Sequence, residues 1–388
     1  MASKTSRDEV SDIIKKFSKE VDIGSIEDIT DKVEGLSTGN LGIDYIVGVG
    51  GLPIGRVVES YGAPSSGKTT LALQTAAELQ QRIIAEGSDD FILYVDFEHA
   101  LDKKYCKSLG LDLTHPSIRV TQPDSLETGA SIARKLLETG KVKLLIWDSV
   151  AEAQVAAVKK AETGDYVPPV KAKIMKQFLE QINDVLYRTR CTAIFINHVQ
   201  EKINMSGPAR GVVSQTTPGG DALKFYSSVR LKFTQTKKNR GKRFSALTNS
   251  MEEYPISTEV KVTVEKNKVA DPHKSCTVLV RYGRGFDNFW QAVQVLEAYK
   301  LITHSGSWYY FDRTPELLLP GLPEGAGRLG AFQGEDKLLK YGESNLEWRA
   351  HIIRAAVEAV NSAAPDMSDE DIEEDENSLD LGRFVEFE

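Results

Sequence analysis

A glycine-flanked loop between a strand and a helix constrains this chain more than any other feature. Residues 62–69 read Gly-Ala-Pro-Ser-Ser-Gly-Lys-Thr, which fits the pattern G-x-x-x-x-G-K-[ST]. Residues 56–61 have the composition of a strand, and residues 71–77 have that of a helix. Such a loop lets backbone N–H groups converge on an anion, while the helix points its positive end at the same anion. The segment therefore predicts a phosphate-binding loop, in which Lys68 reaches the β- and γ-phosphates and Thr69 is a ligand of Mg²⁺.

Charge and composition define the class of protein. The 388 residues are enough for two or three domains, and the net charge is −8. Residues 366–388 contain eleven acidic side chains and one basic one, so the rest of the chain has a net charge of +2. A near-neutral body of this kind can carry basic patches for a polyanion. No apolar run of about 18 residues and no signal segment is present, so we expect no membrane span. Three widely spaced cysteines without metal-ligand spacing favour a reducing cytoplasm.

The order of apolar runs predicts an α/β fold. Between residues 33 and 285, runs typical of buried strands alternate with helical runs, which is the pattern of a mostly parallel, twisted sheet with helices on both faces. The expected parallel strands are at 90–98, 142–150, 192–198 and 228–233. Two further runs, 259–265 and 277–282, alternate more and predict an antiparallel extension.

The rest of the chain divides into three further segments. Residues 1–32 predict an N-terminal helix, because a capping box at Ser6 precedes a helical apolar stripe. The stripe can pack on the chain's own domain or on a neighbouring subunit, and we assign residues 1–32 as a helical oligomerisation segment. Residues 286–364 predict a small α/β C-terminal domain, with a second capping box from Ser344 to Glu347. Residues 365–388 predict a disordered acidic tail, since their charge is high and their apolar content low.

Two carboxylates at strand ends are candidates for metal binding and catalysis. Asp148 ends an apolar strand, where phosphate-loop proteins place the acid that supports Mg²⁺. Glu98 ends the preceding strand and is the predicted catalytic carboxylate, which orients or deprotonates the attacking water. Asp96 is its competitor, two residues deeper on the same face.

Several motifs together resemble the bacterial RecA recombinase family. They include 50–56, the loop at 65–70, Tyr-Val-Asp-Phe-Glu-His-Ala-Leu-Asp-Lys-Lys-Tyr at 94–105, Phe-Ile-Asn-His at 195–198, 217–226, Lys-Asn-Lys at 266–268 and Tyr-Gly-Arg-Gly at 282–285. The match covers about residues 33–300 in order. It implies a RecA-type, phosphate-loop ATPase core that uses ATP and Mg²⁺.

The resemblance also implies roles for single residues. The implied nucleotide-binding residues are Ser65, Ser66, Gly67, Lys68, Thr69, Thr70, Asp102, Tyr105 and Asp148, of which Thr69 and Asp148 serve the metal. Asp102 and Tyr105 are expected to lie against adenine, with the ring of Tyr105 as the stacking surface. The implied catalytic residues are Glu98, Lys68, His198, Lys266 and Lys268. The last two are expected to reach the γ-phosphate of a neighbouring subunit.

Departures from the family pattern concern two residues and one insertion. His198 replaces the usual glutamine that senses the γ-phosphate and signals to a DNA-binding loop. A histidine still donates a hydrogen bond, so the relay is expected to persist with altered pH dependence. Pro218 replaces a more usual threonine. The connection 234–257 is longer than expected, and its run Lys-Lys-Asn-Arg-Gly-Lys-Arg is either additional DNA-binding surface or a solvated hairpin tip.

Two loops resemble the family's DNA-contacting loops. One covers 162–169 and leads into three lysines, and the other covers 199–218. Both follow the carboxyl ends of predicted parallel strands, where this class of fold binds ligands. The implied DNA-binding residues are Pro168, Lys171, Lys173, Lys176, Gly219, Gly220 and Asp221.

The sequence thus predicts a DNA-dependent ATPase that assembles as a helical filament on single-stranded DNA and catalyses homologous pairing and strand exchange. Its expected partners are single-stranded and duplex DNA, further copies of the chain, and single-strand-binding or loader proteins. One alternative is a RecA-like regulatory ATPase that acts on proteins. Another is a hexameric helicase motor, against which the Lys-Asn-Lys pattern and the small C-terminal domain argue.

Overall fold

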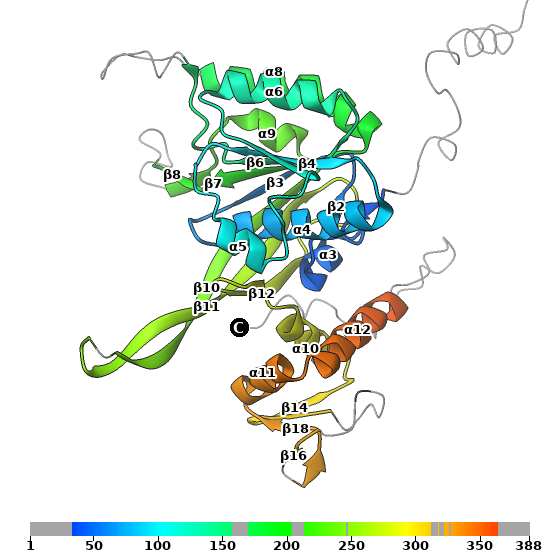
Figure 1. Ribbon diagram of the computed structural model, residues 1–388, viewed down its shortest axis with the longest axis vertical. Coiled ribbons are helices and arrows are strands. Elements are labelled where there is room, and N and C mark those ends of the chain that lie inside the picture. The colour runs from blue at the N-terminus through cyan, green and yellow to red at the C-terminus, as the bar shows by residue number, and fades with distance from the viewer. Residues whose placement is uncertain are drawn as a thin grey trace, which may run out of the picture. The chain divides into compact units, whose positions relative to one another are not determined.

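The computed structural model describes residues 33–363 except 157–169, 204–212, 246, 312–316, 318–321 and 326. The predicted N-terminal helix and acidic tail therefore lie outside the described residues. The fold is α/β, with a large, mostly parallel central sheet (Figure 1).

The central sheet has nine strands among the described residues, in the order β13-β12-β11-β10-β3-β7-β6-β4-β5. Their bounds are β3 Val57–Gly62, β4 Phe91–Asp96, β5 Ile118–Thr121, β6 Val142–Asp148, β7 Thr192–His198, β10 Val229–Ser245, β11 Ser250–Asn267, β12 Ser275–Arg281 and β13 Gly285–Phe286. The strands from β10 to β5 pair in parallel, whereas β10 to β13 pair antiparallel. Both the parallel strands and the antiparallel extension predicted from the sequence are confirmed.

Helices cover both faces of this sheet (Figure 1). The bounds are α3 Leu41–Val47, α4 Lys68–Glu86 and α5 Lys103–Ser108 for one face, and α6 Leu126–Leu137, α8 Val170–Thr189 and α9 Asp221–Tyr226 for the other. Each face has its own buried core, one around Leu71 and Ile146 and one around Trp147 and Phe178. Alternation within β6 sends Ile146 and Trp147 to opposite faces, so one strand supplies both cores.

Two small pairs of strands flank the sheet. β1 (Gly35–Leu36) pairs with β2 (Leu52–Pro53), and β8 (Gln200–Ile203) pairs with β9 (Val213–Thr216). The β8–β9 hairpin follows β7 directly, so it leaves the sheet at the carboxyl edge of the parallel strands.

The C-terminal part is a small α/β arrangement with its own aromatic core. It consists of α10 Asn288–Ala298, β14 Thr303–Ser305, β15 Trp308–Tyr310, β16 Glu324–Gly325, β17 Arg328–Leu329, β18 Ala331–Gln333, α11 Glu335–Ser344 and α12 Leu346–Ala363. Phe289, Phe311 and Phe332 surround the ring of Trp348 at centroid distances of 5.2–5.5 Å. The capping box predicted from Ser344 is wrong. The Ser344 hydroxyl donates to the carbonyl oxygen of Lys340, because the residue ends α11 instead of opening α12.

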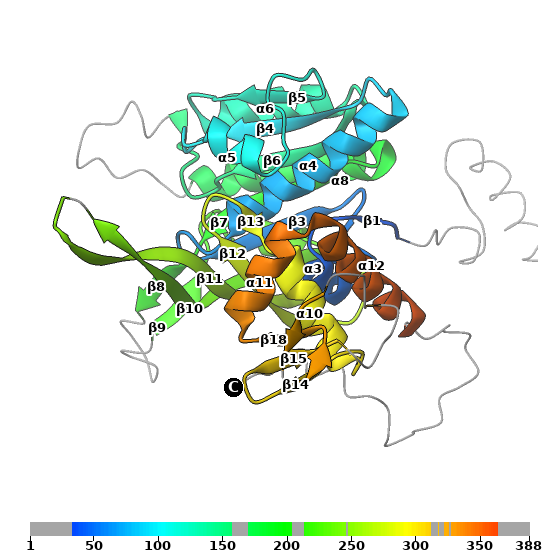
Figure 2. The same ribbon diagram turned by 60° about the horizontal axis from the view of Figure 1, so that its bottom comes forward.

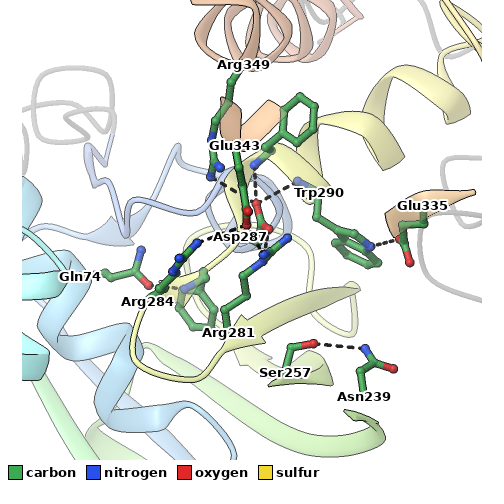
Figure 3. A network of polar contacts seen from close by, with 12 residues as sticks. Gln74, Asn239, Ser257, Arg281, Arg284, Asp287, Trp290, Glu335, Glu343 and Arg349 are labelled. Atoms are coloured by element: carbon green, nitrogen blue, oxygen red, sulfur yellow. Dashed lines mark hydrogen bonds and ion pairs between the residues drawn. The ribbon is translucent and has the colours of Figure 1, made fainter. Parts of the chain in front are cut away.

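A network of charges joins this part to the sheet (Figure 3). Asp287, which is 3% exposed, caps α10 by accepting from the backbone N–H groups of Phe289 and Trp290. Its carboxylate is paired with Arg281 of β12 at 2.5 Å and with Arg349 of α12 at 3.4 Å. One buried carboxylate therefore connects three elements.

A second contact of this region reaches the helix that begins at the phosphate loop. Gln74 of α4 accepts a hydrogen bond from the backbone N–H of Phe286 at 2.7 Å, one residue before Asp287 (Figure 3).

No helix in the described part of the chain is long and apolar enough to cross a membrane.

Candidate functional site

The phosphate loop joins the carboxyl end of β3 to the amino end of α4. Gly67 precedes the first helical residue with a φ of 96°, a conformation that favours glycine. Within the described part of the chain, no side chain caps the first turn of α4, and the hydroxyl oxygen of the buried Ser66 has no hydrogen-bond partner. Unpaired donors at a helix N-terminus fit an anion.

Lys68 is the buried cation of this loop. It is 4% exposed, and its Nζ donates to the carbonyl oxygen of Ala63 at 2.7 Å. Burial lowers its pKa to about 8, while the carboxylates of Asp148 and Glu98 act in the opposite direction. A poorly solvated ammonium gains strongly from a phosphate partner, so this side chain fits the β- and γ-phosphates of a nucleotide.

Thr69 and Asp148, the predicted metal residues, lie next to each other. The Thr69 hydroxyl donates to Oδ2 of Asp148 at 3.2 Å, and the Tyr94 hydroxyl donates to the same oxygen at 2.6 Å. The other oxygen, Oδ1, is buried and has no hydrogen-bond partner among the residues described. Burial raises the pKa of Asp148 to about 6. An unpaired buried carboxylate oxygen beside the phosphate loop fits the oxygen chemistry of Mg²⁺.

Glu98 follows β4 and His198 ends β7, and the two side chains meet across the end of β6, which lies between these strands. His198 Nε2 lies 3.1 Å from Oε1 of Glu98, and both side chains are about one quarter exposed. The contact with His198 is the main reason why the pKa of Glu98 lies below its usual range. Asp96 is instead 1% exposed and accepts from Nε2 of Gln122 at 2.9 Å. Of the two carboxylates, Glu98 is thus the accessible one.

A buried amide connects this site to the loop after β9. Nδ2 of Asn197 donates to Oε1 of Glu59 at 3.0 Å and to the carbonyl oxygen of Pro218 at 2.9 Å. Glu59 is fully buried and is paired with Arg230 at 2.5 Å. Asn197 directly precedes His198, so consecutive residues make the contact with the loop and the contact with Glu98.

The predicted adenine residues lie at the start of α5 and on it, beside α4. Asp102 caps α5 by accepting from the backbone N–H groups of Lys104 and Tyr105. The Tyr105 hydroxyl lies 2.7 Å from that of Thr70. Stacking of adenine on Tyr105 stays a prediction, and the structure adds a hydroxyl contact that fixes this ring to the first turn of α4.

Lys266 and Lys268 lie far from the phosphate loop of their own chain. Nζ of Lys266 donates to the carbonyl oxygens of Lys224 and Phe225, and Nζ of Lys268 donates to that of Phe225. The backbone of Lys268 bonds to Ser228, which bonds to the first residue of β3, whereas the phosphate loop follows the last. The length of β3 thus separates them by roughly 17–20 Å.

The three lysines of α8 do not form one group. Nζ of Lys171 donates to the carbonyl oxygen of Ala151 at 2.6 Å, and burial lowers its pKa. Lys176 is paired with Glu180 at 3.7 Å on the exposed face of the helix. Lys173 is exposed and has no polar partner in the described ranges. Pro168 lies outside the described residues.

The loop before α9 packs against Val150, which follows β6, and against Ala172 in the first turn of α8. Gly219 and Gly220 have φ values of 92° and 76°. A Cβ at Gly219 would lie 2.8 Å from Val150, and one at Gly220 would lie 2.9 Å from Ala172. These glycines therefore have a packing role in addition to the predicted one. Asp221 begins α9 with an exposed side chain paired with Lys224 at 3.2 Å.

Sequence reasoning missed two residues of this site. Tyr94 donates a hydrogen bond to the carboxylate of Asp148. The sequence signal that could have identified it is a tyrosine hydroxyl on the same face of β4 as Asp96, two residues earlier. Gln235 donates from Nε2 to the carbonyl oxygen of Ser65 in the phosphate loop at 2.8 Å. No sequence signal pointed to Gln235, because that contact depends on how β10 continues past β3.

Comparison with known proteins identifies relatives along most of the chain. The family model of the RecA N-terminal domain matches residues 4–287. Protein RecA of Bordetella pertussis is 36% identical over 349 aligned residues, which cover 88% of this chain and 87% of that protein. Protein RecA of Trichodesmium erythraeum is 35% identical over 396 aligned residues, with 97% and 99% covered. Protein RecA of Methylobacterium is 38% identical over 285 aligned residues, with 74% and 72% covered.

Proposed function

The chain belongs to the RecA family, and on that basis we propose that it is a recombinase that forms helical filaments on single-stranded DNA and couples them to ATP hydrolysis. The strongest support is that the candidate nucleotide and DNA-binding elements lie together at one edge of the sheet. The phosphate loop, Asp148, Glu98, His198 and the β8–β9 hairpin all follow the carboxyl ends of parallel strands there. Nucleotide chemistry and a strand-binding loop thus have a common base.

In this proposal the side chains have separate tasks. Lys68 and the first turn of α4 hold the β- and γ-phosphates, and Glu98 accepts the proton of the attacking water. Thr69 and Asp148 would hold Mg²⁺, and the ion would supply positive charge to the phosphates. His198 donates to Glu98 and responds to the γ-phosphate, and Asn197 transmits this response to the loop at Pro218.

Lys266 and Lys268 complete the site of a neighbouring subunit in this proposal. The support is their position at the opposite edge of the sheet from Lys68, which excludes contact with the nucleotide of the same chain. Charges that arrive only on assembly would stabilise the developing negative charge in trans, as an arginine finger does. Hydrolysis would then require a filament.

We also propose that the C-terminal domain begins near residue 286, where the core around Trp348 starts, and that residues 1–32 serve oligomerisation. The buried free thiols of Cys106, Cys191 and Cys276 fit a reducing compartment, and we place the protein in the cytoplasm.

The test is ATP hydrolysis with and without single-stranded DNA, with electron microscopy of the same samples. We expect stimulation by the single strand and helical filaments. Hydrolysis that ignores DNA would favour a regulatory ATPase acting on proteins, and closed hexameric rings would favour a helicase motor. Lys68→Ala is the matched control, because it removes the phosphate cation and abolishes hydrolysis in every case.

A further inference from the structure

The insertion at 234–257 forms a two-stranded ribbon that projects from the sheet. β10 pairs with β3 only from Val229 to Phe233, and β11 pairs with β12 only from Ser257 onward. Beyond these points, β10 and β11 pair only with each other among the described strands, to the register pair Ser245–Ser250. Twelve residues of β10 from position 234 give the ribbon a length of about 40 Å. Figures 1 and 2 show it extending away from the body of the protein.

Positive charge is concentrated on this ribbon. Residues 234–257 contain five basic and two acidic side chains, a net charge of +3. Arg240 faces Glu253 at 3.4 Å, but both are at least half exposed, so the pair neutralises little. Lys238 and Lys242 are exposed and have no polar partner within the described chain. Charge complementarity therefore favours a polyanion as the partner.

The far end of the ribbon is apolar as well as basic. Phe244 and Met251 form a register pair, so they lie on one face, and both are about 60% exposed. Leu247 in the turn is 99% exposed. Proteins that grip duplex DNA use this combination, with basic side chains on the phosphates and apolar ones in a groove or between base steps. An apolar groove on a partner protein would explain the exposed apolar side chains, but it would not explain the excess of positive charge on the ribbon.

The ribbon leaves the sheet beside the proposed single-strand site. β7 and β10 lie on either side of β3 and run parallel to it. The continuation of β7 is the β8–β9 hairpin, and the continuation of β10 is the ribbon, so both begin at the same edge (Figure 2). Gln235, at the base of the ribbon, contacts the phosphate loop at Ser65.

From these observations we infer that the ribbon is an arm that binds duplex DNA, with its basic side chains on the backbone phosphates and its apolar tip in a groove. The width of a two-stranded ribbon suits the major groove of B-DNA. The inference rests on the proposed function, since it gives the filament a binding element for the second DNA molecule. Its position next to the β8–β9 hairpin brings that duplex to the bound single strand.

Two ribbon variants and a matched control test the inference. The first variant carries Lys238→Gln, Arg240→Gln and Lys242→Gln. The second replaces residues 240–256 by Asn-Gly, which closes a hairpin at the existing register pair Asn239–Ser257 and keeps all pairing with β12. The control carries Arg82→Gln, Lys107→Gln and Lys135→Gln, which likewise remove one exposed ion-paired arginine and two exposed lysines.

Binding of a fluorescein-labelled duplex, unrelated in sequence to the single strand, is measured by anisotropy across a salt series, with and without single-stranded DNA. Three lost phosphate contacts flatten the slope of log affinity against log salt by roughly 2.7. A rise from about 50 to about 200 mM salt should then reduce affinity roughly 40-fold less than in the unaltered chain. Both ribbon variants should show this change, and the control should not.

The same samples separate this inference from the proposed function. We expect both ribbon variants to keep hydrolysis stimulated by single-stranded DNA. An unchanged duplex affinity and salt slope in the shortened variant would overturn the inference, as would shorter filaments with unchanged duplex binding, which would assign the ribbon to a second copy of the chain. If the unaltered chain shows no stimulation by single strands, the proposed function fails, and the duplex measurement without single strand still decides the role of the ribbon.

Discussion

Replacing Asp148 by asparagine is expected to stabilise the ligand-free protein at neutral pH while it removes Mg²⁺-dependent nucleotide binding. The carboxylate is 4% exposed and has one unpaired oxygen, and burial raises its pKa from 3.8 to about 6. A raised pKa means that the folded state prefers the protonated form. The charged form, present above about pH 6, therefore opposes folding.

The magnitude follows from the size of that pKa change. An increase of about two units corresponds to roughly 3 kcal/mol of folding free energy, which is lost as the pH rises from about 4 to about 6. Asparagine carries no charge, but its amide remains unpaired at the position of Oδ1, at a cost of about 1 kcal/mol. Asp148→Asn should thus stabilise the protein by about 2 kcal/mol at pH 7. At pH 4, where the carboxyl group of the folded protein is protonated, only the amide cost remains, and the substitution should destabilise the protein by up to about 1 kcal/mol.

Asp287 provides the matched control, because the same substitution should have the opposite sign there. Its carboxylate is equally buried but is paired with Arg281 and Arg349 (Figure 3). Asparagine keeps the cap on α10, since the two residues cap helices about equally well. Arg349 and Arg281 both lose this counter-charge, and Arg281 keeps its second partner Glu343. Asp287→Asn should therefore destabilise the protein by about 3 kcal/mol at pH 7.

The assay is urea unfolding followed by circular dichroism in EDTA without nucleotide, at pH 7 and pH 4. Asp148→Asn should unfold at a higher urea concentration than the unaltered chain at pH 7 and at a slightly lower one at pH 4. An Asp148→Asn protein that is less stable at pH 7 would refute the reasoning. It would mean that contacts of the carboxylate with Tyr94 and Thr69 outweigh its burial.

Three further predictions concern the proposed activity. Glu98→Gln keeps an acceptor for His198 but no base, so it should bind ATP and DNA and turn over ~100-fold or more slowly, and normal hydrolysis in a steady-state assay would contradict the assignment. Lys266→Ala and Lys268→Ala should each bind nucleotide but not hydrolyse it, and mixing either with Lys68→Ala subunits should restore activity, which no mixture would show if the lysines acted within their own chain. Lys173→Gln should weaken single-strand binding and flatten its salt slope by about 1, whereas Lys171→Gln should chiefly lower the melting temperature, and equal effects on DNA binding would show that the two lysines act together.

Local spacing explains why most of the fold and much of the candidate site could be predicted. The phosphate loop is one continuous segment, and its glycine spacing, strand and helix are all visible within about twenty residues. Asp148 and Glu98 follow apolar strands, and parallel strands end at one edge of a sheet, so their proximity needed no further information. The expectation that His198 lies at this edge, near the γ-phosphate, came from the resemblance to the RecA family.

Long-range contacts explain what could not be predicted. Lys171 looked equivalent to Lys173 and Lys176, but the backbone carbonyl of Ala151 lies within reach of it alone. Whether an inserted run becomes a solvated tip or a long ribbon depends on register over many residues, which the sequence does not specify locally. Ser344 had the spacing of a capping box, but a preceding helix already included it, and a hydroxyl within a helix bonds to the carbonyl four residues earlier.

The phosphate loop follows β3, and the two strands beside β3, β7 and β10, suggest how the nucleotide state reaches DNA. β10 continues into the ribbon, whose Gln235 contacts Ser65, and β7 continues toward the β8–β9 hairpin, where Asn197 contacts Pro218 next to the His198–Glu98 pair. Each route passes through hydrogen bonds worth about 1 kcal/mol. Couplings between sites are typically about 1–3 kcal/mol, so one or two such bonds are sufficient for each route. The two routes also meet at Glu59, which contacts both Asn197 and Arg230 of β10. Gln235 contacts the phosphate loop from β10 alone, so loss of this contact should weaken the response of duplex binding to ATP more than the response of single-strand binding.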